Sequence, residues 1–381
     1  MKRNNAMAKL YIILFIVIMC LPYPLWIFFG KYFDTANYEN RSRKAKPLFN
    51  VDTYETFASD YTTYMNDNLP FKNALISFNS RVDYYLFHSS SSDRVIIGKD
   101  GWLFYNDTAD GDPLGDYRGE KIYSEEELQA IVENLQDMEK YLAERGIEFV
   151  IFVAPNKERI YAEMMPDYYG EPAEEYAALQ IVNYIKDHTN IRIVYPYMEL
   201  MQAKSLLPEI DLYYKTDTHW NEAGGYVGSK VLLNELGITV PNITDDEFVV
   251  EGLSYSGGDL TNILHLRKDF EDNSYNISGY DNHNVSNEKW DFPTELIYHC
   301  ENADQRKLFV VRDSFFTSMS EFMASQFNDS YMIHRNVYDH KYLMEQSPDI
   351  FVYEVVERYI ETLGTFSLLY TDESLMETIE E

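Results

Sequence analysis

From residue 92 onward, two hydrophobic patterns take turns along the chain: short continuous apolar runs, and apolar residues at helical spacing. Continuous apolar runs of four to eight residues are typical of buried strands, and apolar residues at helical spacing separate them. The predicted strands cover 147–154, 191–195, 308–311 and 349–354. The predicted helices cover 124–145, 173–187, 221–235 and 315–326. Strands and helices that alternate in this way predict an α/β fold, a parallel sheet covered by helices on both faces.

Three other stretches have patterns of their own. A hairpin is predicted over 94–105, with its turn at Asp100-Gly101. Residues 53–87 are rich in aromatics at mixed spacing, which predicts one or two amphipathic helices. Residues 239–300 are polar and rich in Asn, and we expect a loop-rich insertion there.

The N-terminal segment predicts a membrane anchor. Leu10 to Phe29 contains no charged residue, and twenty residues in a helix span roughly 30 Å, the thickness of a bilayer core. Lys2, Arg3 and Lys9 precede it, which places the N-terminus in the cytoplasm, although five basic residues also follow it between 31 and 46. Its apolar stretch is too long for a cleaved signal peptide, and no small-residue cleavage motif follows.

We therefore expect a single-pass protein of the cell membrane with its main domain outside the cytoplasm. Residues 1–30 would form the cytoplasmic tip and anchor, and 31–91 a membrane-proximal helical connector. Residues 92–381 would form the main domain, with the insertion at about 239–300.

Composition narrows the possible partners. The formal net charge is −31, which excludes nucleic acid as a natural partner because phosphate binding requires clustered Lys and Arg. The two cysteines, Cys20 and Cys300, cannot form a disulfide framework, and neither has a metal-like partner spacing, so we expect no metal. The 33 Tyr and 22 Phe residues suit either sugar binding or ordinary core packing.

Ser314 is a candidate nucleophile. It lies between the predicted strand 308–311 and the following helix, at the edge of the sheet where α/β folds place their sites. Its backbone amide could also stabilise an oxyanion. Serine is equally common as a helix N-cap, and this segment alone favours that interpretation.

Asp217 and His219 supply the two other groups that a serine nucleophile needs. If the chain is locally extended, the two side chains point to the same face, and the carboxylate could hold the imidazole in one tautomer. An Asp beside a surface His is common, so this pair is weak support by itself. Together with Ser314, it provides a nucleophile, a base and an orienting acid.

The stretch Asp217-Thr218-His219-Trp220 resembles the motif of DHHW-domain proteins, which are similar to the alginate O-acetyltransferase family and have an SGNH-hydrolase-like fold. The resemblance extends over about residues 92–360. It includes Gly98 to Phe104, Pro155-Asn156-Lys157, Gly258-Asp259-Leu260 and Asp313-Ser314. It implies that Asp217, His219 and Ser314 are orienter, base and nucleophile.

The resemblance also implies a function. We expect an O-acetyltransferase that needs no cofactor, has a glycan acceptor, either an exopolysaccharide or a cell-wall glycan, and works with a membrane-bound O-acyltransferase partner. An acetyl esterase would use the same triad, since only the entry of water or sugar separates the two reactions. A glycan-binding subunit without catalytic activity is a third alternative.

Four further residues are candidates for binding substrate or an oxyanion. Arg312 stands where the family usually has Gly, and it could bind an acidic group of the substrate. Asn156 could donate to an oxyanion or cap a turn. Lys157 could face the same cleft, although a solvated loop lysine is the more common case. Trp220 could stack on sugar, but packing beneath His219 is favoured.

Overall fold

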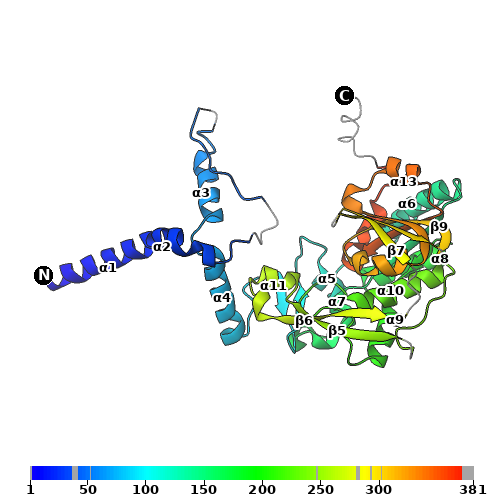
Figure 1. The fold of residues 1–381 in the computed structure, drawn as a ribbon, viewed down its shortest axis with the longest axis horizontal. Helices are drawn as coiled ribbons and strands as arrows, with labels where there is room; N and C mark the ends of the chain where they lie inside the picture. The colour runs from blue at the N-terminus through cyan, green and yellow to red at the C-terminus, as the bar shows by residue number, and fades with distance from the viewer. Residues whose placement is uncertain are drawn as a thin grey trace. The chain divides into compact units, whose positions relative to one another are not determined.

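The described residues form two compact units. The computed structural model describes residues 2–36, 42–51, 53–245, 248–279, 284–291, 294–301 and 303–370 (Figure 1). The first unit contains Met1–Ser92 and Thr261–Asp269, and the second contains Asp93–Leu260 and the chain from Phe270 onward. Residues 371–381, which the predicted main domain includes, lie outside the described ranges, as do parts of the predicted insertion and Arg41. The predicted domain boundaries stay a prediction.

The first unit begins with the apolar segment. The stretch Met7–Tyr32 is long and apolar enough to cross a membrane, which fits either a single-pass anchor or a signal sequence. The helix breaks at Leu21, just before Pro22, because a proline lacks the N–H that the helix ladder needs. The elements of this unit are α1 (Lys2–Cys20), α2 (Pro22–Phe29), η1 (Gly30–Tyr32), α3 (Phe57–Asp67), α4 (Lys72–Phe87) and η4 (Arg267–Asp269). The two helices α3 and α4 lie in the stretch that the aromatic pattern predicted to be helical.

The second unit is built on a seven-stranded sheet. The strand order is β4-β3-β11-β9-β10-β8-β7, with the first five strands parallel and β8 and β7 antiparallel. The predicted α/β fold is confirmed, but the sheet is mixed rather than purely parallel. The strands are β3 (Glu148–Ala154), β4 (Arg192–Val194), β7 (Asn284–Asp291), β8 (Glu295–Glu301), β9 (Asp304–Arg312), β10 (Phe327–His334) and β11 (Ile350–Val356).

Helices cover both faces of this sheet because successive strand residues point to opposite sides. In β3, Val150 and Phe152 pack into one core cluster with α9 and α10, whereas Ile151 and Val153 pack into the other with α6 and α8. Ser124 caps α6 with a reciprocal bond to Glu127, the capping box. The helices are α5 (Pro113–Arg118), α6 (Glu125–Ala143), α7 (Lys157–Ile160), α8 (Ala177–His188), α9 (Tyr197–Leu206), α10 (Glu222–Glu235), α12 (Ser320–Ala324) and α13 (His340–Gln346). The 3₁₀ helices are η2 (Ala162–Met164), η3 (Asp167–Tyr169), η5 (Phe315–Met319), η6 (Arg335–Val337) and η7 (Glu357–Gly364).

The predicted insertion is the main error of the sequence interpretation. Residues 239–300 are not loop-rich, because they contain the hairpin β5 (Val249–Ser256) and β6 (Glu271–Ser278), the short α11 (Asp259–Ile263), and strands β7 and β8 of the main sheet. These strands are rich in Asn, Ser and charge, and β5 and β7 are largely exposed, so they lack the apolar signal of a buried strand. The helix predicted over 315–326 is instead η5 followed by α12. The hairpin over 94–105 forms β1 (Val95–Ile97) and β2 (Leu103–Tyr105).

Candidate active site

Ser314 lies in the turn between β9 and η5, at the carboxyl edge of the parallel strands. Its neighbour Asp313 fixes this turn. One carboxylate oxygen of Asp313 accepts a hydrogen bond from the Phe315 amide at 2.8 Å, and the other accepts one from the Val356 amide at 2.8 Å. Asp313 therefore joins the end of β9 to the end of β11 and leaves the half-buried Ser314 side chain at the surface of the sheet edge.

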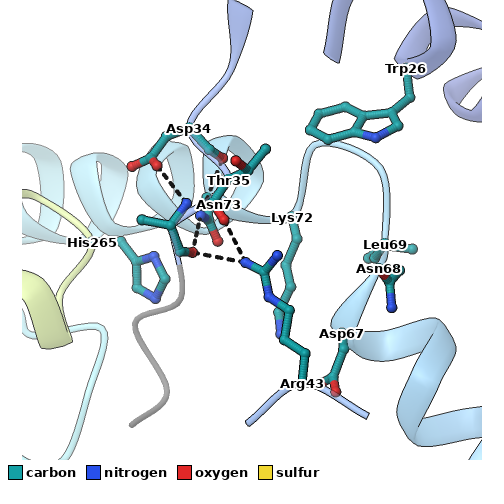
Figure 2. A pocket seen from close by; sticks show the side chains of 11 residues that line it. Trp26, Asp34, Thr35, Arg43, Asp67, Asn68, Leu69, Lys72, Asn73 and His265 are labelled. Carbon is teal, nitrogen blue, oxygen red and sulfur yellow. Dashed lines mark hydrogen bonds between the residues drawn. The ribbon is translucent and has the colours of Figure 1, made fainter. Parts of the chain in front are cut away.

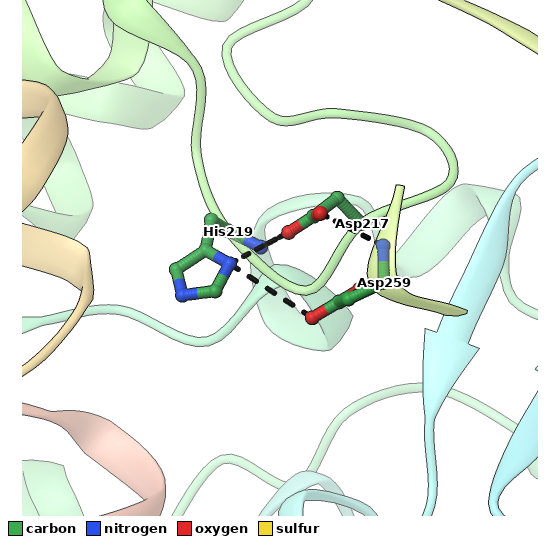
Figure 3. A group of neighbouring side chains, drawn as sticks. All are labelled: Asp217, His219 and Asp259. Atoms are coloured by element: carbon green, nitrogen blue, oxygen red, sulfur yellow. Dashed lines mark hydrogen bonds and ion pairs between the residues drawn. The ribbon is translucent and has the colours of Figure 1, made fainter. Parts of the chain in front are cut away.

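The structure brings His219 and Asp217 into line with this serine. His219 Nε2 lies 2.7 Å from Ser314 Oγ. On the other side of the ring, His219 Nδ1 lies 2.6 Å from Asp217 Oδ1 (Figure 3). The second contact fits an Nδ1–H that donates to the carboxylate, which leaves Nε2 as the acceptor for the serine hydroxyl. Although Ser314 lies 95 positions after His219 in the chain, the three residues form one continuous hydrogen-bonded relay.

Lys157 holds the 214–219 loop that carries Asp217 and His219. Its Nζ donates to the backbone carbonyls of Tyr214 at 3.2 Å, Lys215 at 3.3 Å and Asp217 at 2.6 Å. The prediction of a solvated lysine was wrong, because the residue is only 1% exposed. Burial lowers the pKa of Lys157. Its three carbonyl partners make it a support of the loop, with no free donor for a substrate.

Residues after β5 clamp the same loop from another side. Asp259 donates its backbone N–H to Asp217 Oδ2 at 2.9 Å, and its carboxylate accepts from the Thr218 amide at 2.9 Å and the Thr218 hydroxyl at 2.7 Å. Gly258 approaches so closely that a Cβ there would overlap Asp217. In β6, Asp272 accepts from the amide and hydroxyl of Thr216 at 2.7 and 2.6 Å. The stretch predicted as an insertion therefore positions the relay.

The electrostatics of the relay favour an ionised Asp217. Burial opposes its charge, but His219 and the hydrogen bonds from His219 and Asp259 outweigh burial and lower the pKa of Asp217 to about 2. Burial also disfavours a charged imidazole, yet Asp217 outweighs that effect and raises the pKa of His219 above its usual value. Burial and the neighbouring Asp217 together raise the pKa of Asp259.

Trp220 and Arg312 lie inside the domain. The Trp220 ring is fully buried against Phe315, and its Nε1–H donates to the Phe315 carbonyl at 2.8 Å, so it packs below the relay as favoured and has no surface for sugar. Arg312 is likewise 0% exposed, and burial lowers its pKa while the facing Glu354 of β11 opposes that shift. A contact between Arg312 and an acidic group of the substrate stays a prediction, and the burial of Arg312 argues against it.

Asn156 stands at the end of β3 and is 2% exposed. Its side chain makes no cap on α7, and both of its polar side-chain atoms are buried without a hydrogen-bond partner among the described residues. An unpartnered buried amide is costly, which is typical of a group kept for a ligand. Asn156 makes no side-chain cap on α7, and its role as an oxyanion donor stays a prediction.

The sequence interpretation missed Arg358. This residue follows β11, the strand that lies between β3 and β9, and its guanidinium carbon lies 5.3 Å from the centre of the Phe315 ring. Its Nε is buried without a partner among the described residues, and its charge acts on His219. Its position two residues after an apolar strand, at the carboxyl edge of the sheet, is the signal that could have identified it.

The relay atoms also define a possible cation site. Atoms of Asp217, His219 and Asp259 lie within 4.8 Å of one another (Figure 3). Both imidazole nitrogens, however, lie at hydrogen-bond distance from Asp217 and Ser314. This arrangement fits a proton relay better than a metal centre, and the absence of a metal or cofactor stays a prediction.

Comparison with known proteins agrees with this geometry. The family described as the SGNH hydrolase-like domain of the acetyltransferase AlgX matches residues 95–295, more than half of the chain. The chain belongs to this family. The resemblance to DHHW and alginate O-acetyltransferase proteins is thereby confirmed, and the family is one described as SGNH hydrolase-like and named for an acetyltransferase.

Two relatives with curated descriptions match about half of this chain at identities of 26% and 31%. The probable alginate O-acetylase AlgJ of Pseudomonas aeruginosa is 31% identical over 183 residues, 47% of this chain and 41% of that protein. The AlgJ of Pseudomonas syringae pv. tomato is 26% identical over 210 residues, 54% of this chain and 49% of that protein. The chain spans about half the length of these relatives or less.

Solved structures show the fold. A DHHW family protein from Eubacterium siraeum superposes with a TM-score of 0.52 at 14% identity, covering 73% of this chain and 99% of that one. PatB1 from Bacillus cereus superposes with a TM-score of 0.51 at 15% identity, and the match covers 74% of this chain and 100% of the PatB1 chain. The SGNH-like fold is thus shared across proteins of low sequence identity.

Proposed function

We propose that this protein transfers acetyl groups to hydroxyls of an extracytoplasmic glycan, an exopolysaccharide or cell-wall polymer, through an acetyl ester on Ser314. The observation that carries the proposal is the relay itself. Ser314 Oγ, the two nitrogens of His219 and Asp217 Oδ1 are joined by contacts of 2.7 and 2.6 Å. A nucleophile, a base and an orienting carboxylate in this order activate serine for acyl transfer.

The reaction divides into two balanced steps. In the first, Ser314 Oγ attacks the acetyl carbonyl of the donor, His219 Nε2 takes the serine proton, and the proton then passes to the departing donor group. In the second, a sugar hydroxyl attacks the acetyl-serine, His219 takes the hydroxyl proton, and that proton returns to Ser314 Oγ. The ionised Asp217 stabilises the imidazolium that forms in both steps.

Two groups at the same edge of the sheet support the proposal, and we assign to them the stabilisation of the negative oxygen of each intermediate. Asn156 and Arg358 follow β3 and β11, and Ser314 follows β9, so all three lie at the same edge of adjacent strands. Asn156 has an unpartnered amide and Arg358 an unpartnered Nε. Preorganised donors of this kind are commonly the largest single contribution to acyl-transfer catalysis.

The cellular setting belongs to the same proposal. An uncleaved anchor over Met7–Tyr32 with a cytoplasmic N-terminus would place the catalytic unit outside the cytoplasm. One candidate span is found among the described residues, and a single helix does not by itself form a path for acetyl groups across a membrane. We assign the export of acetyl groups to a membrane-bound O-acyltransferase. The relatives are described as alginate O-acetylases, which supports a polysaccharide acceptor.

The test is the intact mass of the purified full chain after exposure to an activated acetyl ester such as p-nitrophenyl acetate. We expect an acetyl adduct that is absent from Ser314→Ala, with unchanged circular dichroism of the variant. Chromatography of glycan oligomers added to the acetylated protein would then separate transfer to sugar from hydrolysis to acetate. If the wild type showed no acetyl adduct and no ester turnover, the proposed triad would be refuted. A glycan-binding subunit without catalytic activity would then be favoured.

A further inference from the structure

Helix α4 presents two different faces within the first unit. One face is covered by the segment 261–269. Ser77 Oγ donates to the His265 carbonyl at 2.7 Å, and the Arg81 guanidinium binds both carboxylate oxygens of Asp269 at 2.8 and 2.9 Å. This face of the helix is polar and already has its partner.

The opposite face of α4 is apolar and open. Leu75, Phe78 and Leu86 are 58%, 66% and 68% exposed, and they fall with Val82 and Tyr85 on one side of the helix at spacings of three, four and seven residues. Isolated exposed apolar residues are ordinary, but a continuous stripe on one helix requires an occupant. We call these five residues the α4 stripe.

The start of α4 is joined to the end of the apolar N-terminal segment. The Phe71 ring, directly before α4, makes edge contacts with Trp26 at 5.0 Å and Phe33 at 4.9 Å. Asn73 donates to the carbonyls of Asp34 and Ala36 at 3.2 and 3.0 Å. Figure 2 shows Asn73 beside Asp34. The α4 stripe therefore begins where the segment that could cross the membrane ends.

The direction of α4 fits a surface location. Within the first unit α4 runs across the line of α1 and α2 rather than continuing it (Figure 1). If α1 and α2 cross a bilayer, α4 then lies along the bilayer surface. Its stripe includes Tyr85, and tyrosine is one of the residue types that collect at the boundary between lipid and water.

The distribution of charge points the same way. Residues 31–92 contain seven Lys or Arg and seven Asp or Glu, so this region is neutral. Residues 93–381 contain 22 basic and 56 acidic residues. An anionic lipid surface repels the acidic region but not the neutral one. The region that carries α4 is thus the part of the ectodomain compatible with contact to lipid headgroups.

We propose that the α4 stripe lies in the headgroup region of the membrane crossed by Met7–Tyr32, so that α4 is an interfacial helix. This inference rests on the uncleaved anchor included in the proposed function. Helices with one apolar face and a polar face bind in the plane of the lipid surface in this way. The polar face stays above the lipid and holds the segment 261–269.

The experiment uses the full chain, one molecule per nanodisc of phosphatidylcholine and phosphatidylglycerol, with a nitroxide label on Phe78→Cys in a Cys20→Ala background. The buried Cys300 stays unlabelled. Ile16→Cys in the apolar segment and Glu133→Cys on the exposed side of α6 supply the lipid and water references. Collisions with oxygen, which dissolves in lipid, and with a water-soluble nickel complex report the surroundings of each label.

We expect the label at 78 to favour oxygen over nickel, with a ratio between those of the two references. A ratio equal to that at 133 would overturn the proposal. Protection from both reagents would also overturn it, because it would show a protein covering the stripe. Loss of residues 1–30 from the mature protein, seen by mass, would remove the anchor and the proposal with it. Ester turnover of the same samples reports on the proposed function separately.

Discussion

Replacing Asp259 by Asn is expected to move the pH dependence of acetyl transfer to lower pH. The Asp259 Oδ2 atom lies 3.9 Å from His219 Nδ1, so its negative charge favours the protonated imidazole in addition to Asp217. Asparagine has nearly the same shape and keeps an oxygen for the Thr218 amide. The substitution therefore removes a charge from the site while leaving most of the loop geometry in place.

The size of the effect follows from the distance. Two unit charges 3.9 Å apart interact by about 4 kcal/mol at an effective dielectric of 20 and by about 1 kcal/mol in bulk water. The His219 side chain is 26% exposed, and the raised pKa of Asp259 means that the carboxyl carries less than a full charge near its own titration. We therefore expect the low end of this range, a fall of about one unit in the pKa of His219.

The direction in which the pKa of His219 changes determines which assay to use. His219 acts as a base only when neutral, and its pKa is raised in the folded protein, so the rate of acetylation of Ser314 rises with pH through that raised value. Asp259→Asn lowers the pKa, and the rising limb of kcat/KM against pH moves to lower pH. At acidic pH the variant should be faster than the wild type, and on the plateau the two should be similar. Stopped-flow ester turnover across the pH range measures both.

Asp272→Asn is the matched control. It also replaces a carboxylate that holds the 214–219 loop, through Thr216, but Asp272 is not among the main charges that act on His219, so the limb should not move to lower pH. A uniform loss of rate in Asp259→Asn, without movement of the limb, would refute the electrostatic reasoning. It would show that Asp259 contributes only through the position of the loop.

Three further substitutions test other supports of the site. Lys157→Met leaves three carbonyls of the 214–219 loop without their buried donor, and should lower the free energy of unfolding by about 2–4 kcal/mol in urea titrations. Gly258→Ala should displace Asp217 and reduce kcat by about 10²-fold, with an unchanged circular dichroism spectrum; a normal kcat would contradict the close approach. Arg358→Lys keeps the charge but loses the planar guanidinium, and a fall of about 10²-fold in kcat/KM is expected if it stabilises the oxyanion. An unchanged kcat/KM would exclude that role.

Local patterns were sufficient for the framework of the sheet. The apolar run that became β3 and the runs within β9 and β11 are buried on both faces, and this is the environment that a continuous apolar run records. The position of Ser314 followed from the same rule, because the carboxyl ends of parallel strands share one edge. The antiparallel strands β7 and β8 escaped detection, since neither contains a continuous apolar run; β8 instead alternates buried and more exposed residues, a weaker signal over seven positions.

The buried supports of the site could not be predicted, because their contacts join residues that are far apart in the sequence. The buried position of Lys157 depends on carbonyls about 60 residues away, and Asp272 binds Thr216 from a different hairpin. A lysine or an aspartate in a polar stretch has no local feature that separates such a support from a solvated side chain. The burial of Arg312 likewise depends on Glu354, a residue of a neighbouring strand.

One short stretch of chain links the catalytic loop to the anchored part of the molecule. Asp259 and Asp272 bind the 214–219 loop, and between them His265 and Asp269 bind α4. The second unit is therefore continuous with the first at both ends of this stretch as well as after Ser92. If α4 lies on the lipid surface, the chain that positions Asp217 is continuous at both of its ends with a unit held at the membrane. Substitutions in the segment 261–269 could therefore affect both the anchoring contacts of α4 and the support of the 214–219 loop.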